Sequence, residues 1–443
     1  MSTNARTSAA AGTPGVLAGL GAELSSEAEP GALPRHQNAP RHAPMGLFAE
    51  QLSSTPFLVP RAQNRRSWLY RVRPSTEHAD FFPLPHPGVS AWGSHVDPNL
   101  LGWKPRPLPM TPTDFIDGLI TVAVGGSAAD QAGAAIHSFV TNAPMTRKAL
   151  CSADGESLLI PDEGELSVRT EFGRFVIAPG DVLLLPRGAR FSVDPLGQAA
   201  RRGWWVEAFG AGFELPNRGV VGANGLAEGR HFVAPNAAYE VEAGGWTLVH
   251  KYGGSLFAAE ATHGPFDVVA WHGNAVPLVY DLARFCPVGA VSFDHPDPSI
   301  FTVLTAPTGL PGRNALDLAV FPARWDAARH TFRRPSYHRQ AASEWSAILT
   351  GPTSNRVHSR GGSSLAPPFT PHGITPDALE RELSGKDDEK PRFIAETATW
   401  LQLESHFLLS VTDAWRDAPF RDAEFSSMAR GAKVRFPLPG SRP

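Results

Sequence analysis

Short runs in which apolar and polar residues alternate are the main pattern in the middle of this chain. From Glu165 to Val193 the sequence reads ELSVRTEFGRFVIAPGDVLLLPRGARFSV, which is three such runs separated by Gly and Pro. A period of two is typical of strands with one buried face, and Gly and Pro favour the turns between them. We predict a β-meander here, and further strands of this kind near residues 271–274 and 291–306.

Helical signals are sparse, and the clearest begins at Thr375. A threonine can cap a helix, Pro376 suits the first helical position, and residues 378–383 are good helix formers. We therefore predict a short helix that starts soon after His372 and anchors the loop carrying it.

Composition favours short strands and turns over long elements. Gly and Pro number 42 each among 443 residues and show no period. The length suits two or three domains, or one large β body in two parts, with a core that needs no disulfides. Residues 1–15 are rich in Ala, Ser, Thr and Gly, which predicts a disordered tail.

Charge and cysteine content exclude several classes of protein. A net charge of -3 and a pI near 6.6 give no basic field for nucleic acid. Cys151 and Cys286 are too few for a disulfide framework or a cysteine-based metal site. Without a credible signal peptide or membrane span, the chain is expected to be soluble and cytoplasmic, with a small neutral or acidic partner and no membrane partner.

The candidate chemistry lies at His338, Glu344 and His372. Two imidazoles and one carboxylate on one face of Fe(II) leave three octahedral positions open, as an oxygenase requires. Side chains six residues apart on an extended strand point the same way, which favours a shared site for His338 and Glu344. With 16 His and 43 acidic residues such a pair is also expected by chance. The alternatives are a surface histidine beside a solvated glutamate, and zinc in the same triad.

A second histidine site is not expected in the first half of the chain. The Gly180-x5-Pro186-x-Gly188 string resembles the second half-motif of the cupin barrel, but Phe191 stands where a metal-binding histidine should follow. We interpret this barrel half as structural packing.

Several long strings resemble the homogentisate 1,2-dioxygenase family. They are GALPRHQNAPRHAPMGLFAEQLS (31–53), RRSWLYRVRPS (65–75), GVVGANGLA (219–227), DVVAWHGN (267–274), FDHPDPSIFTVLTAP (293–307) and PSYHRQAASEW (335–345). The resemblance runs from about residue 19 to about residue 415. It implies a mainly β, cupin-like barrel or jelly-roll architecture, with an N-terminal β domain at 16–285 containing a degenerate cupin barrel, and a C-terminal catalytic domain at 286–443.

The resemblance also implies a ligand set and an activity. It places the iron ligands at His338, Glu344 and His372, with His372 also close to substrate, and an acid/base histidine at His295. It implies Fe(II) as cofactor, homogentisate and O₂ as substrates, maleylacetoacetate as product, and a hexamer built as a dimer of trimers.

The chain departs from the family pattern at two substrate contacts. A tyrosine about nine residues after the Glu ligand corresponds to Thr353, and a histidine six residues before the last His ligand corresponds to Ala366. Arg356 or His358 could supply a replacement contact, or be a solvated loop side chain. Losing two buried hydrogen bonds would weaken recognition by about 2–6 kcal/mol, so the chemistry is better preserved than the specificity.

Three functions therefore stay open at this point. The first is homogentisate cleavage, the second is cleavage of another hydroquinone or phenol in a biosynthetic pathway, and the third is a non-catalytic metal-binding cupin. No HExxH, P-loop, GxSxG or dinucleotide fingerprint occurs in the sequence, so no motif supports a hydrolase or a nucleotide-dependent function.

Overall fold

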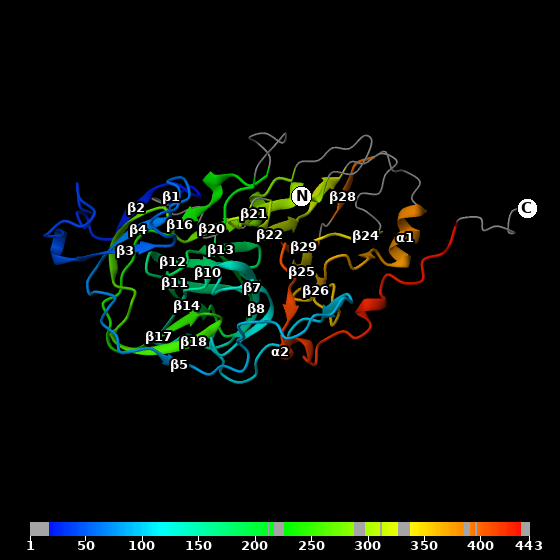
Figure 1. Cartoon of the computed structure of the whole chain (residues 1–443), viewed down its shortest axis with the longest axis horizontal. Coiled ribbons are helices and arrows are strands. Elements are labelled where there is room, and N and C mark those ends of the chain that lie inside the picture. The colour runs from blue at the N-terminus through cyan, green and yellow to red at the C-terminus, as the bar shows by residue number, and fades with distance from the viewer. Residues whose placement is uncertain are drawn as a thin grey trace, which may run out of the picture.

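The computed structural model describes residues 17–210, 212–216, 226–287, 297–310, 312–326, 337–384, 390–394 and 397–435. Within these ranges the chain is mainly β, as expected, and Figure 1 shows a large strand-rich body joined to a smaller one that contains the later strands. The helices are α1 (Pro376–Leu383), α2 (Asp413–Arg416) and 3-10 turns at Pro44–Gly46, Gly229–His231, Leu282–Arg284, Pro298–Phe301 and Phe425–Ser427. The tail expected at residues 1–15 lies outside the described residues.

The larger body consists of three sheets. Among the described residues, the first has nine strands in the order β1 (Leu17–Ala18), β16 (Val233–Ala234), β20 (Leu278–Asp281), β13 (Asp181–Leu185), β10 (Gly155–Glu163), β15 (Arg201–Phe209), β8 (Ala132–Thr141), β7 (Leu119–Ser127) and β30 (Ser410–Val411). The second, in the same ranges, has β12 (Gly173–Ile177), β11 (Leu166–Thr170), β14 (Arg190–Pro195), β9 (Lys148–Ser152), β17 (Ala243–Tyr252), β18 (Ser255–His263) and β5 (Phe82–Pro83). The third has β2 (Leu24–Glu27), β19 (Val268–Gly273), β4 (Arg66–Arg71) and β3 (Phe48–Ser53).

The predicted meander is only partly correct. Strands β11, β12 and β14 pair with one another in the seven-stranded sheet, but β13 lies in the nine-stranded sheet between β10 and β20. All five β13 residues are buried, because the run DVLLL is covered on both faces. A continuous apolar run of this kind belongs in a sheet interior and not in an alternating hairpin.

In the cupin-like half-motif, a packed hydrophobic side chain takes the position expected for a metal ligand. Gly180 and Gly188 have φ values of 106° and 89°, which only glycine adopts without strain. Phe191, at the position where a metal ligand would lie, is 1% exposed and packs against Phe115 and Trp205 with ring centroids 6.2 and 6.3 Å away. Phe191 is therefore part of the hydrophobic packing at this position.

The smaller body is built on one sheet with a buried face and an open face. Its strands, in order, are β21 (Thr302–Pro307), β22 (Asn314–Phe321), β29 (Thr399–Ser405), β25 (Ser343–Thr350), β26 (Ser363–Ala366) and β6 (Leu101–Trp103). Two small ribbons lie beside it, β23 (Arg324–Asp326) with β28 (Arg392–Ile394), and β24 (Tyr337–His338) with β27 (His372–Gly373). Trp345, Leu403 and Leu365 face the core, whereas Glu344 and Glu404 alternate with them and are partly exposed.

The two bodies share strands and a continuous core. β6 comes from the first quarter of the chain and pairs with β26, while β30 comes from the C-terminal part and pairs with β7. Trp204 of the larger body contacts Trp345 of the smaller one edge to face, with ring centroids 4.5 Å apart. The sheet that carries Glu344 is therefore fixed on a rigid base.

No helix in the described residues is long and apolar enough to cross a membrane.

Candidate metal centre

Three strands bring His338, Glu344 and His372 together. His338 in β24 and His372 in β27 lie directly opposite each other in a two-stranded ribbon, and Glu344 is the second residue of β25. One ligand atom from each residue lies within 4.8 Å of the other two. The single extended strand assumed from the six-residue spacing is wrong, because residues 339–342 are not strand and separate β24 from β25.

The distances between the donor atoms suit a shared ion. Glu344 Oε2 lies 3.3 Å from His372 Nε2 and 3.8 Å from His338 Nε2, and the two imidazole centroids are 4.1 Å apart. Ligands bound at about 2.0–2.2 Å to one divalent cation are separated by comparable distances. The donor set of two nitrogens and one oxygen suits Fe(II), and also zinc.

A backbone carbonyl fixes the tautomer of His372. The Nδ1–H of His372 donates to the carbonyl oxygen of Thr370 over 2.9 Å. Nε2 lies within hydrogen-bond distance of Glu344 Oε2, and replacing its proton by a cation would leave a neutral imidazole that keeps Nδ1–H on Thr370 and offers the Nε2 lone pair to the ion. Metal-binding histidines are commonly oriented in this way.

The carboxylate of Glu344 is charged at neutral pH. Burial by itself would raise its pKa, but the neighbouring imidazoles of His338 and His372 lower the pKa to about 2. The same contact acts on His372, whose burial would lower its pKa but whose hydrogen bonds to Glu344 and Thr370 raise it. A deprotonated carboxylate is the state that binds a metal.

Acidic side chains continue from Glu344 across the open face of the sheet. Glu404 is directly opposite Glu344 on β29, and Asp317 is directly opposite Glu404 on β22. Burial, together with the charges of Glu344 and Asp317, raises the pKa of Glu404 to about 7. Sequence reasoning missed Glu404, although the alternation in TWLQLES places it on the same face as Gln402 and Trp400.

The structure brings Ala366 into the site. Ala366 is directly opposite Glu344 across the β25–β26 pair, so both side chains leave the same face of the sheet. Its methyl group is 4% exposed and offers no hydrogen bond. A larger polar side chain at this position would lie beside the Glu344 carboxylate.

Thr353, Arg356 and His358 lie at the other end of the sheet. They follow β25, whose last residue is six positions beyond Glu344, a distance of about 20 Å along an extended strand. His358 packs against Trp400 and Phe425, with ring centroids 5.1 and 5.5 Å apart. The structure therefore does not bring these three residues to His338, Glu344 and His372 of their own chain. His295 lies outside the described residues.

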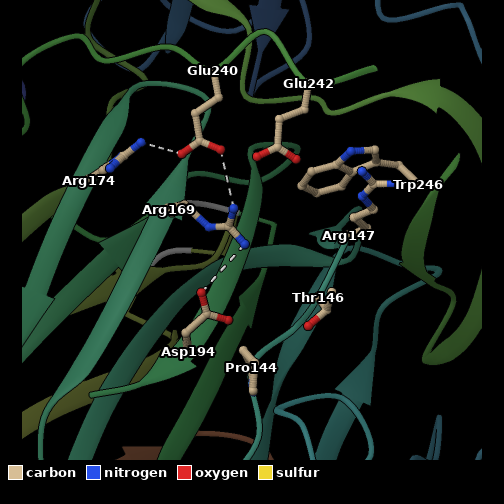
Figure 2. A pocket seen from close by; sticks show the side chains of 9 residues that line it. All are labelled: Pro144, Thr146, Arg147, Arg169, Arg174, Asp194, Glu240, Glu242 and Trp246. Carbon is tan, nitrogen blue, oxygen red and sulfur yellow. Dashed lines mark hydrogen bonds and ion pairs between the residues drawn. The ribbon is translucent and has the colours of Figure 1, made fainter. Parts of the chain in front are cut away.

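A groove elsewhere on the surface is a weaker candidate. It has a volume of about 720 Å³ and is lined mainly by charged side chains. Figure 2 shows Arg169 between Glu240 and Asp194, with ion pairs of 3.4 and 3.5 Å, and Arg174 paired with Glu240. Arg169, Arg174, Glu240 and Asp194 neutralise one another in ion pairs, and no histidine or cysteine is among the described residues that line the groove.

Comparisons with known proteins match almost the entire chain. The family model for the homogentisate 1,2-dioxygenase N-terminal region matches residues 15–282, and the model for the C-terminal region matches residues 283–436. A homogentisate 1,2-dioxygenase from Oryza sativa subsp. japonica is 44% identical over 433 residues, covering 95% of this chain and 92% of the relative.

Solved structures show only a loose likeness. A cupin 2 conserved barrel domain protein from Leptotrichia buccalis has 9% identity and a TM-score of 0.28, covering 68% of this chain and 92% of that one. A variant of the oxalate decarboxylase OxdC from Bacillus subtilis has 13% identity and a TM-score of 0.27, covering 73% and 82%. At these scores neither protein bears on the site.

Proposed function

Because this chain belongs to the homogentisate 1,2-dioxygenase family, we propose that it opens the ring of homogentisate with O₂, using Fe(II) held by His338, Glu344 and His372. The observation that carries the metal assignment is the convergence of these three side chains from three strands. The chemical class, an oxidoreductase that cleaves an aromatic ring, follows from the family.

The protein would supply three ligands, one of them negatively charged, that all lie on one side of the bound ion. Fe(II), when bound, would let electrons pass from the ring to O₂, which the side chains of the site cannot do. Glu344 supplies one negative charge, and the Thr370 carbonyl keeps His372 in the tautomer that binds. Because His338 and His372 come from a two-stranded ribbon and Glu344 from the neighbouring six-stranded sheet, the side of the ion away from these three ligands would be left for small molecules.

A proton must leave the ring hydroxyl when it binds a cation. We propose His295 as the acceptor, since a neutral imidazole has a suitable pKa and the resemblance places the family's acid/base histidine there. Replacing His295 with Gln should reduce turnover and retain metal binding.

A second substrate is favoured by one feature, the methyl group of Ala366 beside Glu344. Because the Ala366 methyl group cannot form a hydrogen bond, a site lined by it binds a polar ring substituent less tightly. This favours a hydroquinone or phenol whose side chain differs from that of homogentisate. The substrate contact expected at Ala366 is then a van der Waals contact with its methyl group. Contacts from Thr353, Arg356 and His358 stay predictions that their own chain does not support.

The deciding experiment loads the protein with Fe(II) anaerobically, adds homogentisate or hydroquinones lacking the acetate arm, and measures O₂ consumption against product absorbance. Equimolar O₂ uptake with homogentisate supports the first function, and uptake only with another phenol supports the second. Bound Fe(II) without uptake on any phenol would instead favour the non-catalytic cupin. The His338→Ala variant is the control, because it should abolish both metal binding and uptake.

Family membership also motivates a hexameric assembly, which sedimentation velocity of the full chain would test. The cytoplasmic location stays a prediction of the sequence.

A further inference from the structure

The segment between His338 and Glu344 contains a side chain that contacts the Glu344 carboxylate. Gln340 lies two residues after His338 and four before Glu344. Its side-chain Nε2 donates a hydrogen bond to Glu344 Oε2, which is also the oxygen nearest to both imidazoles. The amide therefore acts on the donor atom itself.

The backbone of the same residue holds the segment that leads to His372. The carbonyl of Gln340 accepts a hydrogen bond from the N–H of Phe369 over 2.7 Å. Phe369 has φ 61°, a left-handed conformation that is uncommon outside glycine and that surrounding contacts must maintain. Its side chain is 68% exposed, so packing of the ring does not supply those contacts.

The next residue completes the connection. Thr370 donates from Oγ1 to the Pro98 carbonyl over 2.7 Å, and its own carbonyl accepts the Nδ1–H of His372. One residue, Gln340, thus contacts the carboxylate ligand through its side chain and the histidine-bearing segment through its backbone.

We infer that Gln340 is a positioning residue that fixes Glu344 as a one-oxygen ligand, an inference that rests on the proposed metal site. A carboxylate oxygen has two lone pairs, so Oε2 can bind an ion with one and accept the Gln340 amide with the other. A carboxylate held in this way is hindered from turning to bind through both oxygens. The additional coordination position that a second oxygen would occupy stays open to substrate or O₂.

The test compares metal binding in three forms of the full-length protein. Gln340→Leu removes the donor, Gln340→Asn keeps an amide on a shorter chain, and Gln51→Leu makes the same change at an exposed position on β3. Fe(II) affinity is measured by anaerobic titration, and the visible spectrum of the Co(II)-substituted protein reports the ligand number and geometry. Loss of a hydrogen bond to a metal ligand typically costs about 10–100-fold in affinity.

We expect Gln340→Leu to lose about 10–100-fold in Fe(II) affinity and to shift the Co(II) spectrum, Gln340→Asn to be intermediate, and Gln51→Leu to match the unmodified protein. An unchanged affinity and spectrum in Gln340→Leu, with binding abolished in His338→Ala, would overturn the role of Gln340 and leave the proposed function standing. Absence of stoichiometric binding in the unmodified protein would overturn both. Far-ultraviolet circular dichroism verifies that each variant is folded.

Discussion

Removing the buried ammonium group of Lys251 should destabilise the larger body strongly. Lys251 Nζ lies 2.7 Å from Asp154 Oδ2 and 2.7 Å from Glu207 Oε2, and the three side chains are 1%, 2% and 0% exposed. Lys251→Met leaves two carboxylates buried without their cation. Glu207 keeps a 2.8 Å contact with His137, which cannot replace both ion pairs.

The expected loss of unfolding free energy is about 3–5 kcal/mol. Each ion pair has a gross Coulomb energy of about 6 kcal/mol at 2.7 Å and an effective dielectric constant of 20, most of which offsets desolvation. Breaking a buried pair by removing one partner typically costs about 3–5 kcal/mol, a large part of the usual 5–15 kcal/mol stability. The measurement is urea denaturation followed by tryptophan fluorescence, since Trp205 packs 4.9 Å from His137.

Lys148 on the neighbouring strand is the matched control. It forms a 2.6 Å ion pair with Asp114, but its side chain is 36% exposed. Lys148→Met removes one ion pair, whose ammonium is already reached by solvent, and should therefore cost less than Lys251→Met, which removes two fully buried pairs. Equal losses for the two variants, or a loss below about 1 kcal/mol in Lys251→Met, would refute the assignment of this energy to burial.

Three other predictions concern single substitutions. Glu344→Gln should abolish stoichiometric Fe(II) binding, measured by titration, because the neutral amide replaces the charged ligand; retained binding would contradict the assigned ligand set. Ala366→His should raise kcat/KM for homogentisate about 10-fold, because one hydrogen bond is worth roughly 1.4 kcal/mol; a decrease would show that the position excludes bulk. Burial raises the pKa of Asp181 to about 6 from 3.8, so the folded protein binds this proton more tightly and stability falls as pH rises from about 4 to above 6. Asp181→Asn should thus stabilise by about 1–3 kcal/mol at pH 8 and have no such effect at pH 4, as measured by thermal unfolding at the two pH values.

The sequence was informative where a local rule determined the structure. The helix α1 begins at Pro376, and the Thr375 side chain accepts a hydrogen bond from the Ala378 N–H, as the capping pattern predicts. Alternation also predicted strands β11, β12 and β14. In both cases neighbours along the chain supply the stabilising contacts.

Predictions from the sequence were wrong or missing where contacts between residues far apart in the chain determine the structure. No local pattern assigns β13 to a different sheet from β14, or places Thr353 at the far end of the strand from Glu344. The role of Gln340 depends on its backbone hydrogen bond with Phe369, and the sequence pattern does not predict that these two residues are neighbours in space. Glu344 and His338 were paired for the wrong reason, since they lie on two different strands, β25 and β24, and not on one continuous strand.

The exchange of β6 and β30 between the two bodies has a consequence for biosynthesis. Leu101 in β6 leaves the ribosome long before its partner Leu365, and Val124 in β7 waits still longer for Ser410. At about 5–20 residues per second the delay is on the order of 15–60 s. During that time unpaired sheet edges are open to wrong partners, so we expect nascent chains to need chaperones and to acquire the metal only after release.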